Sequence, residues 1–191
     1  MSGPPQFPLW QRAVKRARVP MGFLFAGAYL VLAHPSGRSM LAGLLLVLPG
    51  VALRASASGH VKKNAELTTT GPYAYTRNPL YLGSMLIAFG FAIASHNGWI
   101  AVALVALFAA IYWPTMLAEE GHLRSHFPGY DAYAQRVPRL LPRLLARAHG
   151  GGAPNAGQFS WALYRKHREY NALLGSAMLY AALALKMLWQ R

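Results

Sequence analysis

The chain has 191 residues, enough for one domain, and 54% of them are hydrophobic whereas only 13% are charged. Soluble domains carry about 25% charged residues, so this balance indicates a protein that faces lipid. The net charge of +14 is compatible with a nucleic-acid partner, but the basic residues lie between apolar runs, which favours a membrane protein without such a partner. The absence of cysteine excludes disulfides and thiolate metal sites.

Five apolar segments follow one another along the chain. The stretch before them, Met1 to Pro20, is basic and has no apolar core, so it does not resemble a cleavable signal peptide. The first two segments are short and predict an antiparallel hairpin, whereas the fifth is about long enough to span a bilayer alone. The segments cover residues 21–33, 40–53, 80–95, 99–118 and 171–189. They predict an all-α, multi-pass membrane protein with about five membrane helices.

The distribution of positive charge predicts the orientation in the membrane. Apart from Arg38, Lys186 and Arg191, every Lys and Arg falls before the first segment, between the second and third, or between the fourth and fifth. These regions share one side if all five segments span, and the positive-inside rule makes that side cytoplasmic. We therefore expect a cytoplasmic N-terminus. The basic stretch 164–168 leaves open that the fifth segment lies in the interface instead.

A run of glycine, alanine and proline divides the second long cytoplasmic stretch and is typical of a flexible linker. The predicted organisation is a membrane core at residues 1–147 with four spans, a linker at 148–158, and a C-terminal helix at 159–191 that is transmembrane or interfacial. The three glycines at 150–152 follow no strand, so they do not form a dinucleotide-binding loop, and no Rossmann domain is predicted.

Acidic residues are scarce, and two of the five are adjacent, Glu119 and Glu120, where the fourth segment ends. Adjacent like charges repel, so a positive partner is expected. The alternative is a solvated helix end, although a carboxylate at a helix C-terminus opposes the helix dipole.

The stretch from Gly71 to Gly83 is the second dense feature, with two prolines, two glycines, three tyrosines and one arginine. Its Gly-Pro start predicts a turn, and Pro79 suits the first turn of the third segment. Free backbone N–H groups and Arg77 would then gather at a helix N-terminus, which favours an anionic group. Tyrosines at a membrane edge are often interface anchors, which would explain one or two of the three.

Residues 70–83, TGPYAYTRNPLYLG, closely resemble the G-x-Y-x-x-x-R-H-P-x-Y-x-G signature of isoprenylcysteine carboxyl methyltransferases and their phospholipid methyltransferase relatives. Residues 119–139 contain EEGHL, FPGYDAY and RVPR, which resemble the second block of the same family. The resemblance covers roughly residues 53–142. It implies S-adenosylmethionine bound from the cytosolic side, and a lipidic or prenylated small-molecule acceptor that enters from the membrane lipids.

The resemblance also implies the site residues. Glu119 would bind the cofactor ammonium, while Tyr73 and Tyr81 would stack on adenine or face the sulfonium. Arg77 would be either a carboxylate clamp or a structural partner of Glu120. The implied cofactor-binding residues are Ala65, Glu66, Leu67, Thr68, Tyr73, Asn78, Pro79, Leu80, Tyr81 and Glu119.

Two positions depart from the family pattern. Asn78 replaces the usual histidine, which matters only if the imidazole is used. Thr115 stands where the isoprenylcysteine enzymes carry a substrate-binding arginine, and the neighbouring Pro114 predicts a helix kink. We take Tyr112 and Thr115 as candidate substrate-binding residues. Prenylcysteine is therefore expected to be a poor acceptor, with an ethanolamine head group or another small hydrophobic acceptor as the alternative.

Methyl transfer needs mainly that the two reactants are positioned. A carboxylate acceptor needs no base, whereas an amine must lose a proton, for which Glu120, His122, His126 and Tyr81 are candidates. The predicted catalytic residues are Arg77, Glu120 and His122. The two histidines lack a third ligand, so no metal site is predicted. A non-catalytic scaffold and a transporter are the competing classes of function. The intact Glu119 argues against a scaffold, and the absence of acidic residues within the predicted spans argues against a transporter.

Overall fold

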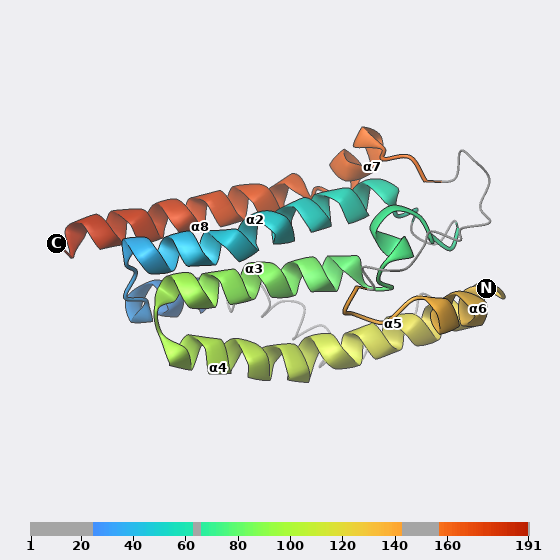
Figure 1. The fold of residues 1–191 in the computed structure, drawn as a ribbon, viewed down its shortest axis with the longest axis horizontal. Helices are drawn as coiled ribbons and strands as arrows, with labels where there is room; N and C mark the ends of the chain where they lie inside the picture. The colour runs from blue at the N-terminus through green and yellow to red at the C-terminus, as the bar shows by residue number, and fades with distance from the viewer. Residues whose placement is uncertain (1–24, 63–65, 143–156, 191) are drawn as a thin grey trace, which may run out of the picture.

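The computed structural model describes residues 25–62, 66–142 and 157–190. Every regular element within these ranges is a helix. Figure 1 shows the long helices lying roughly along one direction, with the C-terminal helix α8 beside α2. The predicted cofactor residue Ala65 and most of the predicted linker lie outside the described ranges. The all-α prediction is confirmed for the rest.

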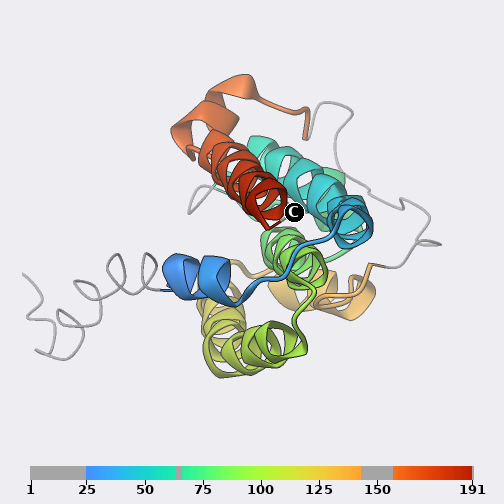
Figure 2. The same cartoon turned by 90° about the vertical axis from the view of Figure 1, so that its left-hand side faces the viewer.

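Among the described residues, three helices are long and apolar enough to cross a membrane, and they cover Gly37–His60, Gly98–His126 and Tyr170–Trp189. A fourth apolar helix, α3 (Pro79–Ser95), is shorter. Residues 25–32 of the first segment are also helical. It runs across the end of the bundle (Figure 2), so the predicted antiparallel hairpin does not form there. The chain is a multi-pass helical membrane protein.

Helix α2 (Gly37–His60) begins with a reciprocal cap between two serines. Ser39 N–H donates to Ser36 Oγ at 3.2 Å, and Ser36 N–H donates to Ser39 Oγ at 3.0 Å. The helix contains Pro49 and continues past Leu53, where the apolar segment ends, to His60. The added turns carry Arg54 and several small residues beyond the apolar segment, into the region that the sequence predicts to be cytoplasmic.

Helices α2 and α3 pack along a seam of four glycines. Gly43 faces Gly90, and Gly50 faces Gly83, and the two glycines of each helix are seven positions apart. A Cβ built on Gly50 would lie 2.8 Å from the Gly83 carbonyl oxygen, so the two backbones approach more closely than alanine would allow. Such small-residue seams are typical of membrane helices, where close contact replaces the hydrophobic driving force.

Helices α4 (Gly98–Leu107) and α5 (Trp113–His126) are joined by a single π-helical turn, η2 (Phe108–Tyr112). Trp113 N–H donates to the Phe108 carbonyl, the wide spacing of a π turn. Pro114 has no N–H to continue the regular ladder, which accounts for the irregularity here. The kink predicted at Pro114 therefore takes the form of a widened turn just before it.

The C-terminal segment packs against the core. Ser160 N–H donates to the Gly59 carbonyl at 2.9 Å, just before the short helix α7 (Trp161–Lys166). Farther along, α8 (Tyr170–Trp189) lies beside α2, and Lys186 Nζ donates to the Val31 carbonyl at 2.9 Å. This segment is therefore attached to the core at both of its ends.

Candidate active site

The residues that the sequence analysis selects surround one cavity of about 550 Å³. It lies where α2 ends, α3 begins and α5 passes, so it joins the two blocks of motifs. Thr115 is not among the lining residues. The predicted residues that do line it are Glu66, Leu67, Thr68, Tyr73, Arg77, Asn78, Pro79, Leu80, Tyr81, Tyr112, Glu119, Glu120 and His122.

The Gly71–Gly83 stretch folds as the short 3-10 helix η1 (Gly71–Ala74), a loop, and the first turns of α3. Gly71 has φ of +58°, a conformation that glycine adopts without strain. The loop binds the second block through its backbone. Arg77 N–H donates to the Pro138 carbonyl at 2.9 Å, and Tyr133 hydroxyl donates to the Tyr73 carbonyl at 2.7 Å.

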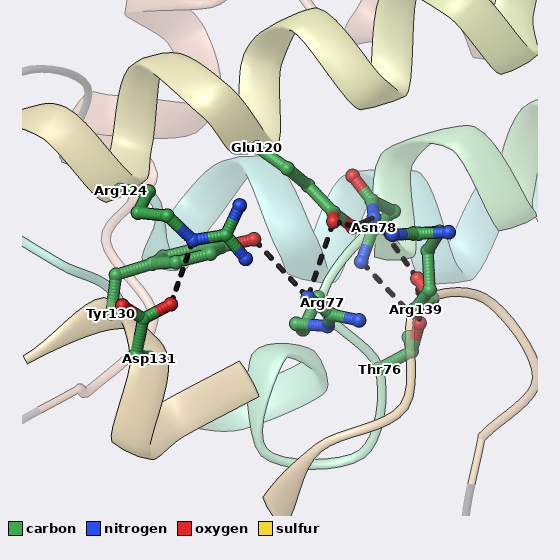
Figure 3. A network of polar contacts seen from close by, with 8 residues as sticks. All are labelled: Thr76, Arg77, Asn78, Glu120, Arg124, Tyr130, Asp131 and Arg139. Atoms are coloured by element: carbon green, nitrogen blue, oxygen red, sulfur yellow. Dashed lines mark hydrogen bonds and ion pairs between the residues drawn. The ribbon is translucent and has the colours of Figure 1, made fainter. Parts of the chain in front are cut away.

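Glu120 is the centre of a buried polar network (Figure 3). Its side chain is 4% exposed, and its two oxygens accept four hydrogen bonds. Arg77 Nη1 donates at 3.2 Å, Asn78 Nδ2 at 3.1 Å, and Arg139 donates through Nε at 3.0 Å and Nη2 at 3.1 Å. Such pairing is what a buried carboxylate requires. Arg77 thus pairs with Glu120, in agreement with one of the two alternatives for this residue.

Asn78, which replaces the family histidine, uses its side chain to hold this network together. Its amide donates to Glu120 and also to the Arg139 carbonyl at 3.0 Å. The neighbouring Thr76 hydroxyl donates to the same carbonyl at 3.2 Å. Position 78 therefore contributes a side-chain donor here in addition to its backbone.

Glu119, one residue earlier, has a contrasting environment. It is exposed to the cavity, and its Oε2 accepts a hydrogen bond from the Tyr81 hydroxyl at 2.9 Å. Tyr81 in turn packs edge-to-face on Tyr112, with ring centroids 5.8 Å apart. In the part of the chain that the structure describes, Glu119 is the one acidic residue without a basic partner. The other four acids are all paired: Glu66 with Lys62, Glu120 with Arg77 and Arg139, Asp131 with Arg124, and Glu169 with Arg54.

Tyr73 lies near the carboxylates of the cavity. Burial raises its pKa, and the charges of Glu119 and Glu169 raise it further, so the phenol stays protonated. A protonated phenol beside carboxylates is a hydrogen-bond donor, and the ring offers an aromatic face to a bound ligand.

The two candidate substrate-binding residues lie in different places. Tyr112 lines the cavity at the end of the π turn, where its ring also stacks on Phe108 at 5.4 Å. Thr115 is exposed, and its hydroxyl donates to the Ile111 carbonyl within the same turn. Thr115 therefore satisfies a carbonyl of the widened helix, while Tyr112 faces the ligand space.

His122 and His126 are both exposed, with ring centroids 3.9 Å apart, and of the two only His122 lines the cavity. Among the described residues, no three His, Cys, Asp or Glu side chains lie close enough to hold a metal ion.

Nine lining residues were not predicted from the sequence, and three of them, Arg54, Ser84 and Glu169, form a connected polar group. Arg54 falls just beyond an apolar segment, and Glu169 is an acid within a basic stretch; each is unusual in its surroundings. The signal that could have identified Arg54 and Glu169 is a charge that differs from its sequence neighbours, because an isolated charge next to an apolar or oppositely charged stretch indicates a partner elsewhere in the fold.

Comparison with known proteins identifies the region that carries most of this site. Residues 39–129 match the family model for phospholipid methyltransferase. The nickel-cobalt-cadmium resistance protein NccN of Alcaligenes xylosoxydans xylosoxydans is 37% identical over 100 residues, which cover 51% of this chain and 46% of that protein. The cobalt-zinc-cadmium resistance protein CzcN of Cupriavidus metallidurans is 35% identical over 83 residues, 44% of this chain and 38% of that protein.

The chain thus spans less than half the length of these curated relatives. No solved structure matches it. The family match contains the Gly71–Gly83 stretch, Glu119 and Glu120, which are the residues that carry the family resemblance in the sequence. Residues 39–129 of this membrane protein are therefore similar to the phospholipid methyltransferase family.

Proposed function

We propose that the chain is an S-adenosylmethionine-dependent methyltransferase that methylates a lipidic acceptor in this cavity. The observation that carries the proposal is Glu119, a carboxylate that faces a tyrosine-lined cavity and has no basic partner among the described residues. In a chain whose other described acids are all paired, such a carboxylate is suited to a cationic ligand. The phospholipid methyltransferase match supports the same conclusion.

The residues of the cavity fit the groups of this cofactor. Glu119 would accept hydrogen bonds from the ammonium, and Tyr81 and Tyr112 would face the sulfonium with their aromatic rings. The backbone at residues 78–81 would hold the carboxylate or ribose. When bound, the cofactor supplies an electrophilic methyl group.

The contacts support a different division of roles among the three predicted catalytic residues. Glu120 and Arg77 satisfy each other and hold the loop against the second block, so we propose that they position the site and do not transfer protons. His122 is exposed at the cavity and is the candidate that keeps a free ring for proton transfer from an amine acceptor. A carboxylate acceptor would need no such base.

For the acceptor, we propose a lipidic or prenylated molecule that reaches the cavity from the bilayer on the cytoplasmic side. An ethanolamine head group is the alternative, and it is compatible with the family description, which names phospholipid. The relatives are named for resistance to nickel, cobalt, zinc and cadmium. A non-catalytic scaffold would keep the fold but would not need an unpaired Glu119.

The decisive experiment measures binding of S-adenosylhomocysteine to the purified protein in detergent by calorimetry. Glu119→Ala should weaken binding at least about tenfold, equivalent to ~1.4 kcal/mol. Asp131→Asn is the matched control, because it breaks an exposed ion pair outside the cavity and should bind as the wild type does. If the wild-type protein does not bind the ligand, the enzyme proposal fails.

The acceptor is tested with radiolabelled methyl groups from S-adenosylmethionine, offered with host lipid extract, a prenylcysteine analogue or phosphatidylethanolamine. We expect labelled lipid and little labelled prenylcysteine, because Thr115 replaces the arginine that would meet the carboxylate. Efficient carboxyl methylation of the prenylcysteine analogue would contradict this expectation.

A further inference from the structure

Glu169 is the one residue beyond position 133 that lines the cavity within the described part of the chain. It is the last residue before α8 and lies outside the 39–129 family match. Its side chain is 12% exposed. A nearly buried carboxylate in a wall of the site needs an explanation that the family match does not supply.

The partner of Glu169 is Arg54 on α2. Arg54 Nε donates to Glu169 Oε2 at 3.0 Å, and Arg54 Nη2 donates to Oε1 at 2.9 Å, which is a bidentate pair. The Arg54 side chain is 24% exposed. A bidentate pair with this little exposure is held in one geometry and is screened far less than a surface pair.

The third nitrogen of Arg54 reaches α3. Nη1 donates to the Leu80 carbonyl at 3.4 Å and to Ser84 Oγ. The passage is open because Gly83 has no side chain: a Cβ there would lie 2.6 Å from Arg54 Cγ. Arg54 therefore connects Glu169 to the first two turns of α3, which carry the residues proposed to hold the cofactor.

The chain on either side of Glu169 is fixed to α2 as well. His167 Nδ1 lies 3.0 Å from the Ser58 carbonyl, and the Phe159 ring packs edge-on to His60 at 6.1 Å. With α8 beside α2, the carboxylate at position 169 has little freedom to leave Arg54. The C-terminal segment thus forms a preorganised wall of the cavity.

We propose that Glu169 and Arg54 are positioning residues of the cofactor cavity, and that the C-terminal segment is a part of the site that the family region alone does not contain. Glu169 orients the Arg54 guanidinium, and Arg54 fixes the start of α3 relative to α2. Without the carboxylate, the guanidinium loses two charge-assisted hydrogen bonds and shifts its remaining contacts at Leu80 and Ser84. This inference rests on the proposed function, because its readout is cofactor binding.

The test measures the dissociation constant of S-adenosylhomocysteine and the unfolding temperature for the full chain in detergent. Glu169→Gln should weaken binding at least about tenfold at a temperature where the protein is folded. Glu169→Asp, which keeps the charge, should recover most of the affinity, and Asp131→Asn should change nothing. An ion pair that only stabilises the fold would lower the unfolding temperature and leave the dissociation constant of the folded protein unchanged.

Arg54→Lys is the second variant, because it keeps the positive charge but cannot make the bidentate contact and reach Ser84 together. It should also weaken binding. Wild-type affinity in either Glu169→Gln or Arg54→Lys would overturn the inference while leaving the proposed function intact. No binding by the wild-type protein would overturn both.

Discussion

Glu119 and Glu120 are adjacent in the chain, and the structure predicts opposite consequences when each is replaced by alanine. Glu120→Ala removes the acceptor of four hydrogen bonds and leaves Arg77, with a side chain 12% exposed, as an unpaired buried charge. Removing one partner of a buried ion pair costs about 3–5 kcal/mol. For a chain of this length, each kcal/mol lowers the unfolding temperature by roughly 2–4 °C, so we expect a fall of about 6–20 °C.

Glu119→Ala removes an exposed carboxylate with one hydrogen bond from Tyr81. The unfolding temperature should stay within about 2 °C of the wild type, as is usual for exposed positions. Thermal unfolding in detergent, followed by tryptophan fluorescence, measures both variants. The same samples should give the reverse order for S-adenosylhomocysteine binding while they are folded. The reasoning is refuted if Glu120→Ala melts with the wild type, or if Glu119→Ala melts as low as Glu120→Ala.

Two further predictions concern the glycine seam and Tyr73. Gly90→Ala should lower the free energy of unfolding by about 1–3 kcal/mol, because its Cβ would lie 2.7 Å from the Gly43 carbonyl oxygen. Gly175→Ala is the control, since the space around Gly175 is open. Equal unfolding temperatures for the two variants would contradict this prediction. Because burial raises the pKa of Tyr73, its stabilising contribution should be present below about pH 10, the value for unfolded tyrosine, and lost as pH rises through the folded pKa. Tyr73→Phe should therefore flatten the alkaline limb of a stability–pH curve, and parallel curves for the two proteins would argue against it.

The membrane class, the helical fold and the family resemblance could be predicted from the sequence because each depends on local pattern. Apolar segments longer than a globular strand define the helices, and the Gly71–Gly83 stretch is continuous in the chain. Even the irregular helix before Pro114 follows from one missing N–H group. The sequence also predicted that this stretch and the two glutamates lie together, because the helical pair α3 and α4–α5 returns the chain to the same end.

The different roles of Glu119 and Glu120 could not be predicted from the sequence. Neighbours on a helix point about 100° apart, so one faces the cavity and the other the buried loop, but sequence alone does not fix the rotation of the helix. The Arg54–Glu169 pair was missed for another reason. Its members are 115 residues apart and meet only because α8 packs beside α2. A contact of this kind depends on tertiary packing, which no local pattern encodes.

The glycine seam between α2 and α3 has a consequence for the cavity at its end. Gly50 lies four residues before Arg54 on α2, and Gly83 directly precedes Ser84 on α3. The contact between the two glycines therefore fixes how the helices are aligned along their length where Arg54 meets Ser84. Sliding one helix past the other by a single turn, about 5.4 Å, would separate these two side chains. The buried Gly43–Gly90 contact therefore helps to align the two helices farther along, where Arg54 meets Ser84, and a substitution at this contact should reduce affinity at a site that it does not touch.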